Sequence, residues 1–399
     1  DLVPIRVTEK SADLVLSELN QENSDTNTEI GIEEETSQKI EQMPNLAPEV
    51  SSTNTKQGNF LSRNNKTQEG EIKFKNLQLK EARDIFLIEK DVDLVANYFL
   101  GLISAYENDG KAVYAYMQKV KDNAPSEDLA LKASEIIKAF DEFNLYRGST
   151  GDHLAVLIGR AFLNVGETNL GIIKLKEALK INPYYKDALV ILGTAYVMQN
   201  NFKEAEKYLV QAIPIDRPEP NYYLGLVRFS LGKFNEAVLA FEEAKKKAYK
   251  PEVELRNKLG ETYLKLNKPN EALIEFNRVI ELTPLNPEVY YNPIWINLKV
   301  LNDYEKALYY AEANLNTNPN LALSHDLMGW VYLEAGEYKM AKKYLDAALD
   351  LDRNLFSAYF HLAKYYEANL DLEQAKAHYK MVVTLSPNSS LGREAKVAM

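Results

Sequence analysis

The stretch from Leu259 to Pro284 has apolar residues at helical spacing and is typical of two helices joined at Asn267–Pro269. On the first helix, one stripe that includes Gly260 and Tyr263 points toward the second helix. A second stripe lies three residues before the glycine and one and four residues after it. These offsets correspond to i, i+4 and i+7, which share one helical face. The pattern therefore predicts a helical hairpin whose first helix has a separate second face.

The same pattern recurs at intervals of 32 to 35 residues. The glycine position is filled in seven successive units by Gly159, Gly193, Gly225, Gly260, Trp295, Gly329 and Ala363. Twelve residues later stands a small residue, at Gly171, Ala205, Ala237, Ala272, Ala307, Ala341 and Ala375. Sixteen residues later stands a bulky one, at Leu175, Leu209, Phe241, Phe276, Leu345 and Tyr379. Self-similarity at this period predicts a stack of helical hairpins that cover one another.

Close packing explains why a glycine stands inside a helix. Glycine there costs about 1 kcal/mol relative to alanine, so tight packing must offset the loss. We expect Gly260 to face Ala272 on the second helix, because small residues at a crossing let two helices approach. Pro284 then ends the second helix, since proline has no backbone N–H to donate.

These residues together resemble the tetratricopeptide repeat, a helix–turn–helix unit of about 34 residues. The resemblance covers residues 151–387 as seven units. It implies an all-α fold, an α-solenoid whose stacked repeats form a right-handed superhelix with a concave groove. Two units depart from the pattern: the third has Arg228 where an aromatic is expected, and the fifth has Trp295 at the glycine position and Pro293 before it. That proline should kink or shorten its helix, either as tolerated drift or as a bend that shapes a partner site.

Residues 73–150 are less regular and predict a divergent helical region, with helices near 76–89, 92–107, 111–122 and 127–145. Gly101 and Pro125 stand 24 residues apart, as glycine and proline do in regular units, so 92–125 is interpreted as a divergent repeat. An extra helix or half-unit is expected between it and Gly159. Residues 388–399 predict a short helix that covers the last repeat, because solenoids need such caps.

Residues 1–72 form an acidic segment of a different kind. Residues 1–70 hold 13 Asp and Glu against 6 Lys and Arg, and their only aromatic residue is Phe60. So few apolar residues cannot build a core, and we expect this segment to be extended or disordered. Leu2–Val7 is a candidate strand and Ser11–Leu19 a candidate amphipathic helix, so the segment is either a spacer or a docking peptide.

Composition excludes several classes of function. The chain has no cysteine, which removes thiolate metal sites and a cysteine nucleophile, and no apolar run approaches the roughly 18 residues of a membrane span. The net charge of −11 includes no basic face, so nucleic acid is not an expected partner. Phosphate-binding, zinc and nucleophile-elbow motifs do not occur, and we expect no cofactor, no metal and no enzyme activity.

The sequence leaves the compartment open. The protein is either cytoplasmic, or exported or tethered to a membrane in a bacterium.

The second stripe of each first helix is the candidate binding face, because the resemblance places it on the concave surface. The candidate partner-binding residues are Arg160, Tyr222, Leu226, Phe229, Asn257, Asn292, Lys299, Trp330, Phe360 and Lys364. Asn257 and Asn292 occupy equivalent positions, and an asparagine amide can pair with both groups of an extended peptide backbone. The aromatic residues are candidate anchors. For each large apolar group the alternative is packing between repeats.

Two functions follow from this reading. The first is a non-catalytic scaffold or adaptor that binds a protein or extended peptide in the groove. The alternative is a structural subunit of a larger assembly, for example at the cell envelope, docked through repeat edges and residues 1–72. The pattern does not settle the oligomeric state.

Overall fold

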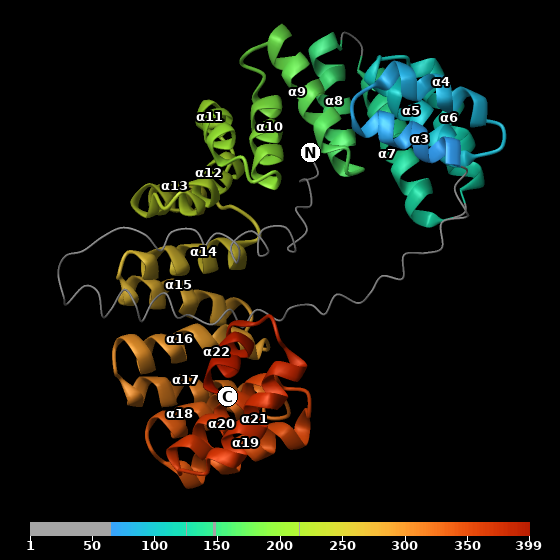
Figure 1. Cartoon of the computed structure of the whole chain (residues 1–399). Coiled ribbons are helices and arrows are strands. Elements are labelled where there is room, and N and C mark those ends of the chain that lie inside the picture. Colours follow the sequence, from blue (N-terminus) through green and yellow to red (C-terminus); the bar gives the residue numbers. More distant parts are fainter. Residues whose placement is uncertain (1–64, 125, 147–148, 215) are drawn as a thin grey trace. The chain divides into compact units, whose positions relative to one another are not determined.

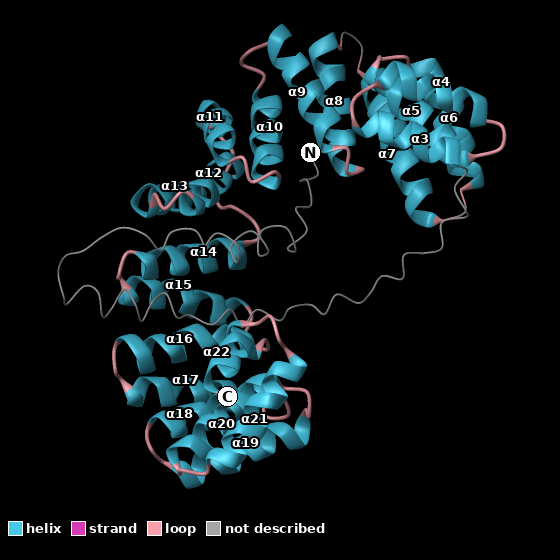
Figure 2. Ribbon diagram, viewed as in Figure 1, coloured by secondary structure: helices cyan, strands magenta, loops and turns pink. Residues whose placement is uncertain are grey.

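The computed structural model describes residues 65–399 apart from 125, 147–148 and 215, and in this part of the chain every regular element is helical (Figure 1, Figure 2). The candidate strand at Leu2–Val7 and the candidate helix at Ser11–Leu19 lie outside the described residues. The chain divides into two compact units, and among the described residues the division falls between Leu231 and Gly232.

The first unit consists of antiparallel helices packed in sequence order. Most of them form helical hairpins, and one long helix, α7, packs between two hairpins without belonging to either. Its helices are α3 (Asn65–Lys75), α4 (Leu79–Glu89), α5 (Leu94–Tyr106), α6 (Gly110–Asn123), α7 (Glu127–Leu145), α8 (Gly151–Asn164), α9 (Thr168–Ile181), α10 (Lys186–Met198), α11 (Phe202–Ala212) and α12 (Glu219–Ser230). The helix α7 is the extra element expected before Gly159, whereas α3 was not expected. Because α3 begins at Asn65, the boundary that we placed at residue 72 falls inside this helix.

The second unit continues the same arrangement to the end of the chain. Its elements are α13 (Phe234–Lys246), α14 (Glu252–Lys265), α15 (Pro269–Leu282), the 3₁₀ helix η1 (Pro287–Tyr290), α16 (Tyr291–Trp295), the π-helical turn η2 (Ile296–Val300), α17 (Tyr304–Thr317), α18 (Ala322–Glu334), α19 (Tyr338–Leu351), α20 (Phe356–Ala368), α21 (Leu372–Leu385) and α22 (Ser390–Ala398). At the C-terminal end, α22 packs against α21 and α20. A Cβ on Gly392 would lie 1.9 Å from the carbonyl oxygen of Ser386, so only glycine permits this close approach.

The turn after each first helix holds one residue with positive φ, seven residues after the glycine position. These residues, with φ between 52° and 90°, are Leu77, Asn108, Gly166, Asn200, Gly232, Asn267, Asn302, Gly336 and Leu370. Glycine and asparagine adopt this left-handed conformation most readily, and they fill seven of the nine places. The first two positions extend the repeat geometry toward the N-terminus, with Gly70 and Gly101 as their glycines.

The glycine of the first helix contacts the bulky residue sixteen positions later. A Cβ on Gly260 would lie 2.6 Å from the ring of Phe276, so the nearest side chain to Gly260 is that of Phe276 and not that of Ala272. In the first regular unit the expected small pair does meet, because a Cβ on Gly159 would lie 3.2 Å from the carbonyl oxygen of Gly171. Six glycines have the same partner position, in the pairs Gly70 and Phe86, Gly101 and Met117, Gly159 and Leu175, Gly193 and Leu209, Gly260 and Phe276, and Gly329 and Leu345. The missing side chain therefore makes room for a large side chain on the second helix.

The fifth regular repeat departs from this geometry, as Pro293 predicted. Its first helix is divided into η1, α16 and η2, and Leu301 donates its N–H to the carbonyl of Ile296, five residues back, at 2.9 Å. The large residue has also changed sides, because Trp295 stands at the glycine position and Ala311 sixteen residues later. Both side chains are buried in one apolar cluster.

Candidate functional site

In the first unit, the candidate binding face contains one ion pair and several apolar side chains that are buried or half-buried. The Arg160 guanidinium on α8 binds the Glu142 carboxylate on α7 at 2.6 Å. Tyr222 on α12 is only 1% exposed, whereas Leu226 and Phe229 on the same helix are half-buried. Tyr222 therefore packs between helices, which is the alternative stated for these aromatic residues, and does not offer an anchor.

In the second unit, Asn257 on α14 and Asn292 on α16 keep their predicted equivalence. Both lie three residues before the glycine position, and both side chains are half-buried. Neither amide makes a hydrogen bond with another residue that the structure describes. Each amide therefore retains a donor and an acceptor that can pair with a ligand.

Trp330 on α18 and Phe360 on α20 are buried, with 5% and 6% exposed. Trp330 lies in a stack of three rings from successive repeats, at 5.4 Å from the Tyr291 ring and 5.4 Å from the His361 ring. Its indole N–H donates to Glu334 at 3.1 Å. These two aromatic side chains tie repeats together and are not accessible as anchors for a partner.

The His361 ring of this stack also belongs to a buried polar pair. The His361 Nδ1 lies 2.7 Å from the Asp326 carboxylate, which is fully buried. Burial, helped by the Asp326 charge, raises the pKa of the Tyr291 hydroxyl well above its usual value. The pair joins α18 to α20. Asp326 stands three residues before Gly329, the repeat position of Asn257 and Asn292, but the sequence pattern did not indicate His361 as its partner.

The two predicted lysines have partners within the protein. The Lys299 ammonium in η2 lies 2.5 Å from the Glu334 carboxylate on α18. The Lys364 ammonium lies 3.5 Å from Glu367 and 3.5 Å from Glu394 on α22, and 5.5 Å from the centre of the Phe360 ring. Both lysines therefore join neighbouring repeats, and their charge is compensated before any ligand binds.

A further network of charges, which the sequence analysis missed, joins α13, α14 and α15. The buried Glu275 carboxylate accepts hydrogen bonds from Lys245 at 2.9 Å and Arg256 at 2.7 Å. Glu252 accepts from Arg256 and, at 3.2 Å, from Arg278. The bond from Arg278, aided by Arg256, lowers the pKa of the Glu252 carboxyl. The only sequence signal was the density of Glu, Lys and Arg, which is equally typical of a solvated face.

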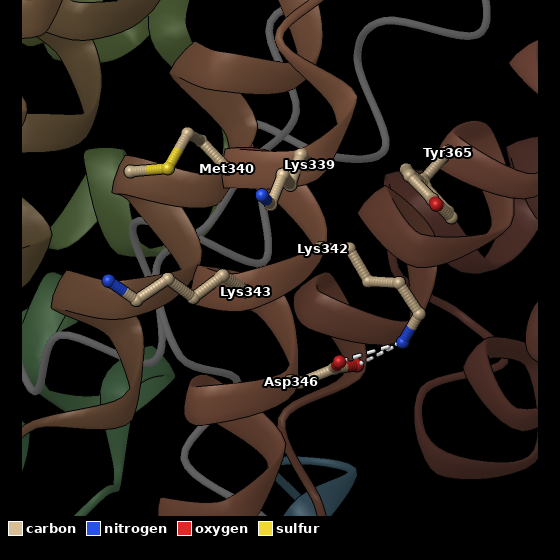
Figure 3. Close-up of a pocket in the computed structure, with 6 residues that line it drawn as sticks. All are labelled: Lys339, Met340, Lys342, Lys343, Asp346 and Tyr365. Carbon is tan, nitrogen blue, oxygen red and sulfur yellow. Dashed lines mark hydrogen bonds and ion pairs between the residues drawn. The ribbon is translucent and has the colours of Figure 1, made fainter.

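A hollow of about 510 Å³ lies between α19 and α20, and Figure 3 shows the side chains that line it. Its lining residues are Lys339, Met340, Lys342, Lys343, Asp346 and Tyr365. Lys342 already binds Asp346 at 2.7 Å, so only part of the positive charge is open to a ligand. This hollow contains none of the predicted binding residues.

The described residues contain no group of three His, Asp or Glu side chains placed to hold a metal ion. In the same part of the chain, no helix is both long enough and apolar enough to cross a membrane.

Comparison with known proteins finds one family. Models described as tetratricopeptide repeat match residues 174–227, 222–287, 323–355 and 357–389. The TPR repeat-containing protein YpiA of Bacillus subtilis is 26% identical over 263 residues, 64% of this chain and 53% of that protein. The BBSome complex member BBS4 of Bos taurus is 23% identical over 202 residues, 50% of this chain and 38% of that protein. The chain spans about half the length, or less, of these curated relatives.

Among solved structures, a tetratricopeptide repeat protein from Parabacteroides merdae is 15% identical with a TM-score of 0.47, and the match covers 63% of this chain and 99% of that one. Yeast Tom70 is 14% identical with a TM-score of 0.38, and the match covers 83% of this chain and 93% of that one.

Proposed function

The chain belongs to the tetratricopeptide repeat family, and from that premise we propose that it is a non-catalytic scaffold that binds an extended segment of a partner protein. The family generally mediates protein–protein interactions, and no enzyme family matches the chain. The proposed binding face is the second stripe of the first helices in the second unit.

The observation that carries the proposal is the pair of unpartnered amides, Asn257 and Asn292. They stand at one position of consecutive repeats, half-buried, and make no hydrogen bond with any described residue. A half-buried amide without a partner gains from a ligand that supplies both a donor and an acceptor. The backbone of an extended peptide supplies both at each residue.

The lysines of the same face are already paired with glutamates. This favours a face that recognises the backbone of a bound peptide over one that recognises its charged groups. Lys258 binds Glu261 at 3.0 Å, Lys299 binds Glu334, and Lys364 lies between two glutamates. An ion pair that is already formed offers a ligand little net charge. We therefore expect the bound segment to be extended, without a requirement for a charged side chain or a terminal carboxylate.

The test selects binders from a pool of random twelve-residue peptides displayed on phage, with the whole chain as target. We expect the double variant Asn257→Ala/Asn292→Ala to weaken the selected peptides by at least tenfold, because each lost hydrogen bond is worth about 1 kcal/mol. Asn270→Ala is the matched control, since Asn270 is exposed on the second helix α15, and it should leave the affinity unchanged.

A double-mutant cycle between the peptide and Asn257 tests whether this side chain binds the peptide backbone. Methylation of single backbone nitrogens in a selected peptide removes one N–H at a time. At one or two sites, methylation and Asn257→Ala should be strongly non-additive, because both remove the same hydrogen bond. Fully additive losses at all sites would show that Asn257 does not bind the peptide backbone.

The alternative function, a subunit docked through repeat edges and residues 1–72, predicts a different outcome. Partner association would be lost on deletion of residues 1–64 and retained by the double asparagine variant. That pair of results would contradict the proposed binding face.

A further inference from the structure

Three large apolar side chains stand exposed on the second helices of consecutive repeats in the second unit. Leu239 on α13 is 70% exposed, Ile274 on α15 is 65% exposed and Tyr309 on α17 is 66% exposed. Each lies fourteen residues after its glycine position, so the three share one place in the repeat. We refer to these three residues as the outer stripe.

Side-chain contacts link the three helices that carry the outer stripe. The Lys245 ammonium on α13 lies 2.9 Å from the Glu275 carboxylate on α15. The Tyr310 hydroxyl on α17 donates to the Asn277 side chain on α15 at 2.8 Å. The outer stripe therefore forms one row across neighbouring helices, unlike apolar residues scattered singly over a surface, which need no explanation.

The row is bounded by a change of residue type. At the same repeat position, Lys207 precedes the outer stripe in the sequence and Lys343 follows it. Both are exposed. Lysine is common on a helix face that is exposed to solvent. Apolar residues occupy this repeat position in three consecutive repeats and lysine in the repeats on either side, so the apolar surface is confined to those three repeats.

The charges beside the outer stripe are mostly negative. Among residues three or four positions away on the same helices are six carboxylates and two bases. The two bases are neutralised by neighbours, because Arg278 binds Glu281 at 2.8 Å and Lys306 binds Asp303 at 2.8 Å. Three of the carboxylates make no ion pair with another described residue; these are Glu271, Glu305 and Glu312.

We propose that the outer stripe docks a basic amphipathic helix of a partner protein. Residues i, i+7 and i+14 of a helix recur about every 10.5 Å along one face. A partner helix with apolar side chains at these three positions presents one to each of Leu239, Ile274 and Tyr309. Lysine or arginine beside these anchors complements the uncompensated carboxylates. This surface is distinct from the asparagine face of the first helices.

The test uses a synthetic eighteen-residue helical peptide with leucine at i, i+7 and i+14 and lysine at the flanking positions, labelled for fluorescence anisotropy. It is titrated against the whole chain. We expect saturable binding that Ile274→Lys weakens at least tenfold. We expect several-fold weaker binding when salt rises from 50 to 500 mM, because exposed charges are screened. Exposed substitutions of this kind are usually within about 0.5 kcal/mol of neutral for stability, and circular dichroism verifies folding.

Two variants serve as controls. Leu372 on α21 is as exposed as the outer stripe, at 66%, but lies outside it, so Leu372→Lys should leave the affinity within twofold. Asn257→Ala/Asn292→Ala should also leave it unchanged, which separates this inference from the proposed function.

Several results would overturn the proposal. One is a failure to bind at millimolar peptide, and another is equal binding of a peptide with glutamate in place of lysine. A third is equal weakening by Leu372→Lys and Ile274→Lys. Finally, sedimentation equilibrium that shows a dimer abolished by Ile274→Lys would assign the outer stripe to a second copy of the chain.

Discussion

At the scale of single residues, each regular hairpin depends on one contact between a small and a large side chain. Gly260 gives room to Phe276, and Gly193 gives room to Leu209, because a Cβ at either glycine would lie 2.6 Å from its partner. Such a distance is well inside ordinary van der Waals contact, which begins near 3.5 Å between carbon atoms. The glycines are therefore required by packing and not by backbone conformation.

We expect Gly260→Ala to lower the free energy of unfolding by about 1–3 kcal/mol, because overpacking of the Phe276 ring outweighs the better helix propensity of alanine. Urea denaturation followed by circular dichroism measures the change. Gly260→Ala/Phe276→Leu should recover part of the loss. A Gly260→Ala protein as stable as the parent would contradict the small–large contact.

A second residue-scale prediction concerns pH. The Arg278 and Arg256 bonds lower the pKa of Glu252 in the folded state, so its ionised form stabilises the fold. This contribution is present above the unfolded value of about 4.3 and is lost as pH falls through the lower folded pKa. Glu252→Gln should therefore reduce stability at pH 7, and the difference from the parent should shrink steadily below about pH 5.

Denaturation midpoints measured between pH 3 and 7 test this dependence. Glu312→Gln is the comparison, because Glu312 is exposed on α17 and makes no ion pair with another described residue. A Glu252→Gln difference that stays constant over the whole range would rule out the ion-pair explanation.

At the scale of elements, the fifth regular repeat shows what happens when the small–large contact is reversed. Trp295 stands at the glycine position, and Ala311 takes the position of the bulky partner. The first helix is simultaneously divided into η1, α16 and η2. Pro293 made the irregularity predictable, since proline cannot continue a helical hydrogen-bond pattern. The π-helical turn was not predictable, because it depends on how Trp295 fits between neighbouring helices.

We expect Trp295→Gly to cost about 3–5 kcal/mol through the cavity that it leaves, and Ala311→Leu to cost about 1–3 kcal/mol through overpacking. The double variant Trp295→Gly/Ala311→Leu restores the arrangement of the other repeats and should recover most of the loss. The free energies of unfolding of the three variants give the coupling between the two sites. Additive losses would show that the two positions do not substitute for each other.

At the scale of the whole molecule, periodicity determined most of what the sequence could predict. Seven units followed from residues such as Gly193 and Ala205, which recur at nearly constant spacing. Helix α4 was predicted, as residues 76–89, but α3 was not, although Gly70 and Phe86 have the regular offset, because most of α3 falls in the acidic segment that we expected to be extended or disordered. The exposure of Trp330 and Phe360 could not be predicted, since the same helical face serves both binding and packing between repeats.

The measurement that tests the central claim most directly is amide hydrogen exchange of the whole chain, free and saturated with a selected extended peptide. The account predicts added protection in α14 and in the segment from η1 to η2, the helices that carry Asn257 and Asn292, with smaller changes in α15 and α17. Protection confined to α13, α15 and α17, or absent from the second unit, would contradict it.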